Sequence, residues 1–286
     1  MPPKLNEIPL NDLPKWSGWT AKLIGIEDFA AVTRDLNKIH AEYSQDKWQK
    51  CADNFEKSGG KLNAHDLRVI YYDANSEKRR AAIINGKLVD ACNADVMGWY
   101  DEVLTSAMAP AVAGARTIVE LGCGLGHMLW LMRERFPGLQ YRGGDYADSA
   151  VALASRLYKS TPDISLSKFD FYASTYDLIE KADGPVVVFT SQALEQVPKS
   201  AGVIETLSKH KNKISRVFHM EPAYALYDDG TLLGQLRRRY IELNDYNRDL
   251  ISTLKARKDV EILRLEPHIV GWNPFNSLAL TEWRFR

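Results

Sequence analysis

Three glycines at alternate positions are the most informative feature of the sequence. Residues 117–126 read TIVELGCGLG, so an apolar run leads directly into Gly122, Gly124 and Gly126. Glycines in this pattern let the backbone turn tightly and approach a ligand closely, with the amides of a following helix start facing that ligand. A dinucleotide-binding fingerprint would need a glycine at position 127, where His127 stands, and no Gly-Lys-Ser/Thr follows as in a Walker P-loop. The turn therefore disfavours a nicotinamide or flavin enzyme.

Acidic side chains end the next two apolar segments of the chain. Asp145 ends the segment 139–145, and Asp170, followed by Phe171, ends the segment 164–170. Ligands of open parallel sheets bind at the carboxyl ends of the strands, where a carboxylate can accept hydrogen bonds from two ribose hydroxyls. Asp170 could likewise accept a hydrogen bond from an adenine amino group. The structural alternatives are a helix N-cap or turn for Asp145 and a solvated loop for Asp170.

Together these features resemble the class I S-adenosylmethionine-dependent methyltransferases over about residues 115–286. The family's first motif is an acid, a hydrophobic residue and G-x-G-x-G, matched by Glu120 and the three glycines. The family places an acid on the ribose after the second strand and binds adenine after the third, which Asp145 and Asp170 match. Residues 189–198, FTSQALEQVP, resemble the stretch after the fourth strand, which often ends Leu-Glu-His-Val-Pro.

The resemblance implies a Rossmann-like α/β fold with a doubly wound, mostly parallel seven-stranded sheet and an antiparallel last strand. It implies S-adenosyl-L-methionine as cofactor and methyl transfer to oxygen, nitrogen or carbon of a small molecule or peptide-like metabolite. A nucleic-acid methyltransferase and a non-catalytic S-adenosylmethionine-binding protein remain as alternatives. Glu120 is expected to order the loop or support the methionine end, and Cys123 to fill space in the loop. The expected cofactor-binding residues are Glu120, Gly122, Cys123, Gly124, Gly126, Asp145, Asp170, Phe171 and Ser191.

Two residues near the end of the segment 214–221 are candidates for proton transfer. Period-two alternation puts His219 and Glu221 on the same side of a strand, so Glu221 could orient the imidazole. His219 would suit a general base for a hydroxyl acceptor, because its unperturbed pKa lies near neutrality. The alternative is a packed histidine with Glu221 as its partner.

Glu195 is a third catalytic candidate, since it follows the segment 186–190 near the expected methyl position. Its alternative role is that of a helix-start acid stabilised by the helix dipole. Gln196 stands where the family often has His, and Gln cannot act as a base. A base must therefore come from elsewhere or be unnecessary, as for an amine nucleophile.

The elements that would position these residues begin after residue 115. Short β-branched runs alternate there with helix-length segments, which predicts a parallel sheet with helices on both faces. A long helix is predicted over 232–254, followed by two antiparallel strands at 260–270 and 276–286. The parallel strands are predicted at 117–121, 139–145, 164–170, 186–190 and 214–221.

Residues 1–110 are predicted to form a mostly helical extension that covers the pocket, and residues 111–286 the methyltransferase domain. Apolar residues at helical spacing predict helices over 27–55, 66–84 and 87–108. The aromatic candidates for the cover, with core packing as their alternative, are Tyr43, Trp48, Trp99 and Tyr100.

Composition and charge limit the classes of partner that the chain is expected to bind. The 286 residues include 37 Lys+Arg and 37 Asp+Glu, with 45% hydrophobic residues, as in ordinary globular proteins. Because the charges balance, the chain lacks the excess of basic residues that is typical of proteins that bind nucleic acid or a membrane surface. The composition therefore favours a small-molecule or peptide-like substrate. Three widely spaced cysteines without a C-x-x-C pair argue against disulfides and a zinc site. With no pattern of a signal peptide or membrane span, a cytoplasmic location is expected.

Overall fold

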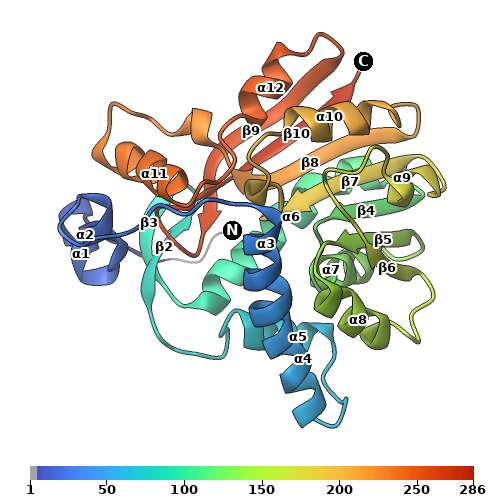
Figure 1. The fold of residues 1–286 in the computed structure, drawn as a ribbon, viewed down its shortest axis with the longest axis horizontal. Helices are drawn as coiled ribbons and strands as arrows, with labels where there is room; N and C mark the ends of the chain where they lie inside the picture. Colours follow the sequence, from blue (N-terminus) through green and yellow to red (C-terminus); the bar gives the residue numbers. More distant parts are fainter. Residues whose placement is uncertain (1–4) are drawn as a thin grey trace.

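The parallel half of the sheet follows the sequence-based prediction closely (Figure 1). The computed structural model describes residues 5–286. The strand β4 lies at the centre of this half, with β5 and β6 on one side and β7 and β8 on the other, all parallel. These strands are β4 (Thr117–Leu121), β5 (Gln140–Asp145), β6 (Ile164–Lys168), β7 (Val186–Ser191) and β8 (Ile214–Pro222).

The last two strands are antiparallel, as predicted. The strand β10 (Leu278–Phe285) lies between β8 and β9 (Val260–Gly271) and pairs antiparallel with both. The predicted long helix before them is wrong: the chain forms α11 (Leu232–Leu243) and α12 (Leu250–Ala256) instead. The helix is interrupted at Asp245, whose φ of 49° is left-handed.

Three further strands from the N-terminal region extend the sheet. They are β1 (Asn6–Glu7), β2 (Arg80–Ile84) and β3 (Lys87–Ala91). In residues 5–286 the sheet thus has ten strands rather than seven, in the order β1-β3-β2-β9-β10-β8-β7-β4-β5-β6. The predicted helices over 66–84 and 87–108 are therefore wrong for residues 80–91, which form the hairpin β2–β3. Helices α5 (Ala64–Tyr71) and α6 (Asn93–Val112) flank this hairpin. The domain boundary near residue 110 stays a prediction.

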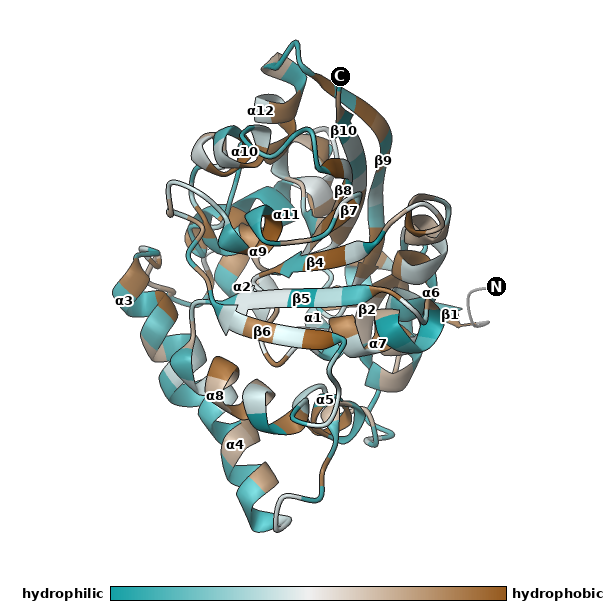
Figure 2. Ribbon diagram, turned by 90° about the vertical axis from the view of Figure 1, so that its right-hand side faces the viewer, coloured by the Kyte–Doolittle hydropathy of each residue, from teal (hydrophilic) through white to brown (hydrophobic). Residues whose placement is uncertain are grey.

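Helices cover both faces of the sheet (Figure 2). Apolar residues of α6, α7 (His127–Arg135) and α8 (Asp148–Leu157) pack with Ile118 of β4 on one face. Val119, the next residue, packs on the other face with α9 (Asp177–Glu180), α10 (Ala201–Ser208) and α12. This arrangement explains why every residue of β4 is buried: helices cover the strand on both sides.

The N-terminal segment reaches the end of the sheet where the parallel strands terminate. The predicted helix over 27–55 begins only at α3 (Leu36–Ile39), where the Asp35 side chain accepts a 2.7 Å hydrogen bond from the Lys38 N–H. It continues as a π-helical segment (His40–Lys47) and α4 (Trp48–Lys57). Apolar residues of α4, α5 and α8 form one cluster beside the glycine turn. The remaining short helices are η1 (Leu10–Asp12), α1 (Leu13–Trp16), α2 (Trp19–Leu23), η3 (Leu194–Gln196) and η4 (Tyr224–Leu226).

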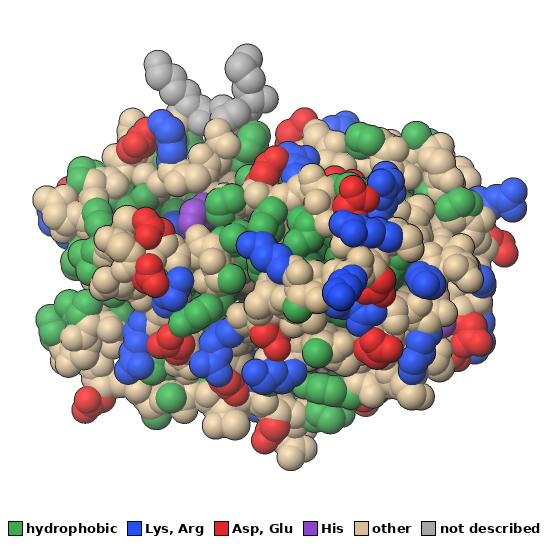
Figure 3. Space-filling view, turned by 90° about the horizontal axis from the view of Figure 1, so that it is seen from above, with side chains coloured by type: hydrophobic (Ala, Val, Ile, Leu, Met, Phe, Trp, Pro, Cys, Tyr) green, Lys and Arg blue, Asp and Glu red, His purple; other side chains and the backbone are tan. Residues whose placement is uncertain are grey.

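The surface carries mixed charge. Figure 3 shows Lys and Arg interspersed with Asp and Glu over the face it presents. None of the helices in residues 5–286 combines the length and apolar character needed to cross a bilayer.

Candidate active site

The loop between β4 and α7 requires glycine at its three alternate positions. Gly122, Gly124 and Gly126 have φ values of 77°, 53° and 72°, in the left-handed region. A Cβ would lie 2.3 Å from the Ala193 Cβ at Gly122, and 2.5 Å from the Trp48 ring at Gly124. Both the backbone conformation and the lack of space therefore disfavour any other residue at these glycine positions.

Asp145, the last residue of β5, is hydrogen-bonded to this loop. Its Oδ2 accepts from the Gly124 N–H at 2.7 Å, and its Oδ1 accepts from the Ala147 N–H at 2.8 Å. Burial raises the pKa of Asp145, while these N–H groups act in the opposite direction. Each carboxylate oxygen has a second acceptor site, so Asp145 can hold the loop and also accept from a diol.

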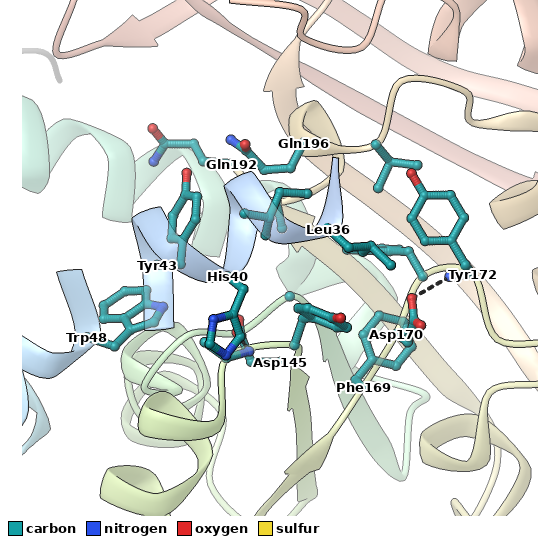
Figure 4. Close-up of a pocket in the computed structure, with 17 residues that line it drawn as sticks. Leu36, His40, Tyr43, Trp48, Asp145, Phe169, Asp170, Tyr172, Gln192 and Gln196 are labelled. Carbon is teal, nitrogen blue, oxygen red and sulfur yellow. Dashed lines mark hydrogen bonds between the residues drawn. The ribbon is translucent and has the colours of Figure 1, made fainter. Parts of the chain in front are cut away.

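A first cavity opens between the strand ends and the N-terminal segment (Figure 4). It encloses about 670 Å³ of empty volume. Four predicted cofactor residues line it: Gly122, Asp145, Asp170 and Phe171. The Asp170 Oδ1 accepts a hydrogen bond from the Tyr172 N–H at 2.8 Å. From the N-terminal segment the lining includes Leu36, Ile39, His40, Tyr43 and Trp48.

A second cavity adjoins the first, since Tyr43, Trp48 and Gln192 line both. Its empty volume is about 780 Å³. The predicted residues in its lining are Glu120, Cys123, Gly124, Ser191 and Glu195. The other lining residues are Lys47, Tyr71, Tyr72, His127, Tyr246 and Asn276. Nine of the predicted site residues thus line two adjoining cavities: four line the first, including Gly122, and five line the second, including Gly124.

Two residues that line the second cavity carry buried polar atoms without partners. The Glu120 side chain is 2% exposed, and its Oε2 has no hydrogen-bond partner. Burial, together with the charge of Asp145, raises the pKa of Glu120 well above its usual range. The Trp48 Nε1 is likewise buried without a partner. Because unpaired buried polar groups are costly, these two atoms mark places where a ligand can supply a donor and an acceptor.

Two members of the predicted cofactor set have roles in the loop itself. Cys123 is buried, and burial raises the pKa of its thiol, so it fills space as expected. Gly126 lies outside both cavity linings, and its carbonyl accepts a 2.9 Å hydrogen bond from the Tyr158 hydroxyl. Gly126 therefore shapes the start of α7 rather than the cavity wall.

Glu195 is held by amide side chains at the edge of the second cavity. Its Oε1 accepts from the Gln196 Nε2 at 3.0 Å, and its Oε2 accepts from the Asn276 Nδ2 at 3.2 Å. Arg34 in turn donates to the Gln196 Oε1 at 2.5 Å. Burial, with the charge of nearby Glu221, raises the pKa of Glu195 to about 8. Its contacts are thus those of a positioned titratable group, and Gln196 orients it.

His219 and Glu221 lie outside both cavities. This corrects the expectation that His219 acts as a general base whose imidazole is oriented by Glu221. The His219 ring is 1% exposed; its Nε2 accepts from the Trp283 Nε1 at 2.9 Å, and its Nδ1 is 2.9 Å from the Thr190 Oγ1. Burial lowers the pKa of His219 to about 3. With both nitrogens engaged and no open face, the imidazole has a packing role.

Glu221 holds the loop after β7 rather than the imidazole. Its Oε1 accepts from the N–H groups of Ala193 and Leu194 at 3.0 Å, and its Oε2 accepts from the Glu195 N–H at 3.1 Å. These bonds satisfy the amides at the start of η3. Glu221 is therefore a positioning residue for Glu195.

The aromatic cover is only partly as predicted. Tyr43 and Trp48 line the cavities, whereas Trp99 donates to the Ile269 carbonyl at 3.0 Å and packs in the core. Tyr100 is buried behind the second cavity, where its hydroxyl bonds to Ser191. Sequence reasoning missed Tyr71, Tyr72, Tyr246 and Asn276. The chain carried no spacing signal for them, because they come from elements far apart in sequence.

Within residues 5–286, no three His, Cys, Asp or Glu side chains are grouped so that they could hold a metal ion.

Comparison with known proteins yields similarities of fold. No protein-family model matches the chain, and no curated protein matches it in sequence. The plantazolicin methyltransferase BpumL in complex with SAH is 16% identical, over 66% of this chain and 84% of that chain, with a TM-score of 0.44. Magnesium protoporphyrin IX methyltransferase (ChlM) from Synechocystis PCC 6803 with bound SAH is 15% identical, over 68% and 87%, with a TM-score of 0.46.

The O-methyltransferase NcsB1 from neocarzinostatin biosynthesis, in complex with S-adenosylmethionine and 2-hydroxy-5-methyl naphthoic acid, is 13% identical. It covers 65% of this chain and 57% of that chain, with a TM-score of 0.42. TM-scores below 0.5 carry no argument for function, so we base the functional proposal on the chain's own residues.

Proposed function

We propose that this chain is a class I S-adenosylmethionine-dependent methyltransferase that acts on a small molecule or peptide-like metabolite. One observation carries the proposal: three successive strand ends contribute a glycine loop, Asp145 and Asp170–Phe171 to two adjoining cavities. In this assignment Asp145 accepts from the ribose hydroxyls, Asp170 accepts from the adenine amino group, and Phe171 packs against the base.

The residues present fit this cofactor. The glycine loop offers a backbone surface that a Cβ at Gly122 or Gly124 would fill. The methionine end of the cofactor carries an ammonium donor and a carboxylate acceptor. Glu120 Oε2 and Trp48 Nε1, the buried atoms without partners, offer the complementary acceptor and donor. We therefore assign the loop side of the second cavity to the methionine end.

When bound, S-adenosylmethionine supplies an electrophilic methyl group on a sulfonium. The chain's own residues must align the acceptor, exclude water and hold any proton that leaves. Tyr43 and Trp48 from the N-terminal segment cover the cavities and exclude water. Glu195, which faces the second cavity, is the proton acceptor in this proposal, and His219 is not.

Calorimetry on the purified protein tests the proposal. S-adenosylhomocysteine should bind, and NAD should give no response, because the loop lacks the third glycine of the dinucleotide fingerprint. NAD binding without a response to S-adenosylhomocysteine would refute the assignment. Incubation with S-adenosylmethionine and a panel of acceptors then separates an enzyme from a binding protein, since only an enzyme releases S-adenosylhomocysteine.

A further inference from the structure

Glu195 is a buried carboxylate whose direct partners are neutral. The side chain bonds to the amides of Gln196 and Asn276, and neither carries charge. The nearest cations are directed elsewhere: Arg34 and Lys47 both bond to Glu42, at 3.1 Å and 2.8 Å. An ionised Glu195 therefore has no ion pair of its own, and a buried unpaired carboxylate is costly.

Aromatic residues line the same cavity as this carboxylate. Tyr43, Tyr71 and Tyr246 line the second cavity together with Glu195, and Trp48 stacks on Tyr71 with ring centroids 5.0 Å apart. Aromatic faces attract cations through their quadrupole, and the attraction grows when water is excluded. An unpaired carboxylate beside several ring faces is the chemistry that recognises an ammonium group.

The other ionisable groups of the cavity leave Glu195 as the group that can carry a negative charge. Burial and the charge of Asp145 raise the pKa of Glu120 well above its usual range, and His127 is neutral because burial and nearby Arg68 lower its pKa to about 3. Lys47 also lines the cavity, but its ammonium lies 4.1 Å from the centroid of the Tyr43 ring and bonds to Glu42. This contact shows, within the chain itself, that Tyr43 accepts a cation.

On the basis of the proposed function, we propose that the methyl acceptor is an amine, whose ammonium form is bound by Glu195 and the surrounding rings. A neutral hydroxyl acceptor would leave the carboxylate without a counter-charge. An anionic acceptor would be repelled by an ionised Glu195. The enzyme is then an N-methyltransferase.

The transfer balances with the groups present. Glu195 takes one proton from the bound ammonium, which frees the nitrogen lone pair. That lone pair forms the N–C bond to the methyl carbon as the C–S bond breaks, and the electron pair of the C–S bond stays on sulfur to give the thioether. The product is the N-methylated ammonium, and the proton on Glu195 passes to water after product release.

The protonation state of Glu195 suits this step. Burial and the charge of Glu221 on β8 raise its pKa, while Arg34 and Lys47 lower it, and the balance lies at about 8. The other ionisable groups that face it are tyrosines with raised pKa values, namely Tyr43, Tyr71, Tyr227, Tyr240 and Tyr246. A carboxyl with a pKa of about 8 can bind an ammonium group and also accept its proton. Amine binding should therefore strengthen as pH rises toward 8.

Three probes of one shape test the inference: 2-phenylethylamine, 2-phenylethanol and phenylacetate, titrated by calorimetry into wild-type protein loaded with S-adenosylhomocysteine. We expect the amine to bind at least about tenfold more tightly than the alcohol, and phenylacetate most weakly. Glu195→Gln should remove the tenfold preference while S-adenosylhomocysteine affinity stays within about twofold. Glu77→Gln makes the same change at an exposed side chain and should keep the preference. With S-adenosylmethionine, wild-type protein should convert the amine to its N-methyl product.

The outcomes separate the two proposals. Failure of S-adenosylhomocysteine to bind would overturn the proposed function. If S-adenosylhomocysteine binds, the amine inference alone is overturned by any of three results: equal or tighter binding of the alcohol or carboxylate, no amine binding at millimolar concentration, or a preference that survives in folded Glu195→Gln protein.

Discussion

Replacing Glu195 by Gln should make the protein more stable at alkaline pH. The pKa of this carboxyl is about 8 in the folded protein, against 4.5 for a freely solvated glutamate such as the unfolded chain presents. The folded state therefore keeps a proton that the unfolded state releases, so the free energy of unfolding falls as pH rises from 4.5 to 8. One pKa unit corresponds to about 1.4 kcal/mol, which gives a wild-type penalty of up to about 5 kcal/mol above pH 8. A Gln side chain does not titrate and avoids this penalty.

The substitution is also compatible with the local hydrogen bonds. The Asn276 Nδ2 donates to Glu195 now, and the Asn276 Oδ1 is buried without a partner. If the Asn276 amide turns over, its Oδ1 can accept from the new amide N–H. The Asn276 Nδ2 then takes the place of the unpaired Oδ1, so the number of hydrogen bonds is unchanged, and the difference in stability reports the ionisation of Glu195.

Urea unfolding followed by circular dichroism between pH 5 and pH 9 measures this difference. The variant should match the wild type within about 1 kcal/mol at pH 5 and exceed it progressively up to pH 9. Glu77→Gln, on the exposed surface, controls for the general effect of removing a carboxylate. A variant-minus-wild-type difference that stays constant across this range would refute the reasoning, because it would mean that Glu195 ionises as it does in the unfolded chain.

Three other substitutions test the site. Gly124→Val should nearly abolish S-adenosylhomocysteine binding in calorimetry, because a Cβ there meets the Trp48 ring at 2.5 Å. Gly138→Val is the control: φ is also positive at this position, but no atom lies within 4 Å of the added Cβ, so this variant should bind normally. Asp145→Ala should weaken that binding at least about tenfold, since each hydrogen bond to a charged group contributes roughly 1.5–3 kcal/mol; unchanged affinity would remove Asp145 from the ribose site. His219→Ala should lower the free energy of unfolding by about 2–4 kcal/mol, by leaving a cavity and an unpaired Trp283 N–H, with turnover within about threefold. A hundredfold loss of turnover in folded His219→Ala protein would restore its catalytic role.

The central parallel strands β4 and β7 could be predicted because their residues are buried on both faces. Such strands are continuous apolar runs that end abruptly, as TIVEL does at Gly122. The hairpin β2–β3 was missed although its turn carries the Asn85-Gly86 pair, with φ values of 51° and 79°. Short apolar runs such as RAAII cannot be assigned to helix or strand by periodicity alone. The Asn-Gly pair was the stronger signal.

The cofactor side of the site could be predicted, whereas the acceptor side could not. Asp145 and Asp170 follow strands directly, so the topology of the sheet alone brings them together. Tyr71 and Tyr246 line one cavity with Glu195 only because α5 and the loop between α11 and α12 pack over the same strand ends. Alternation along β8 gave the side on which His219 lies, but not that Trp283 covers it.

The position of β10 has a consequence for the order in which the protein can assemble. The strand nearest the C-terminus is internal: it separates β8 from β9, and β9 carries the hairpin of residues 80–91 through its pairing with β2. On a ribosome, the early hairpin has no strand to join until residues 260–285 have emerged. Pairing between such distant segments is slow, because a long loop must close before any contact rewards it. We therefore expect nascent chains that stop before β9 to lack the completed sheet and to expose the edges of β2 and β8. Such chains should bind chaperones.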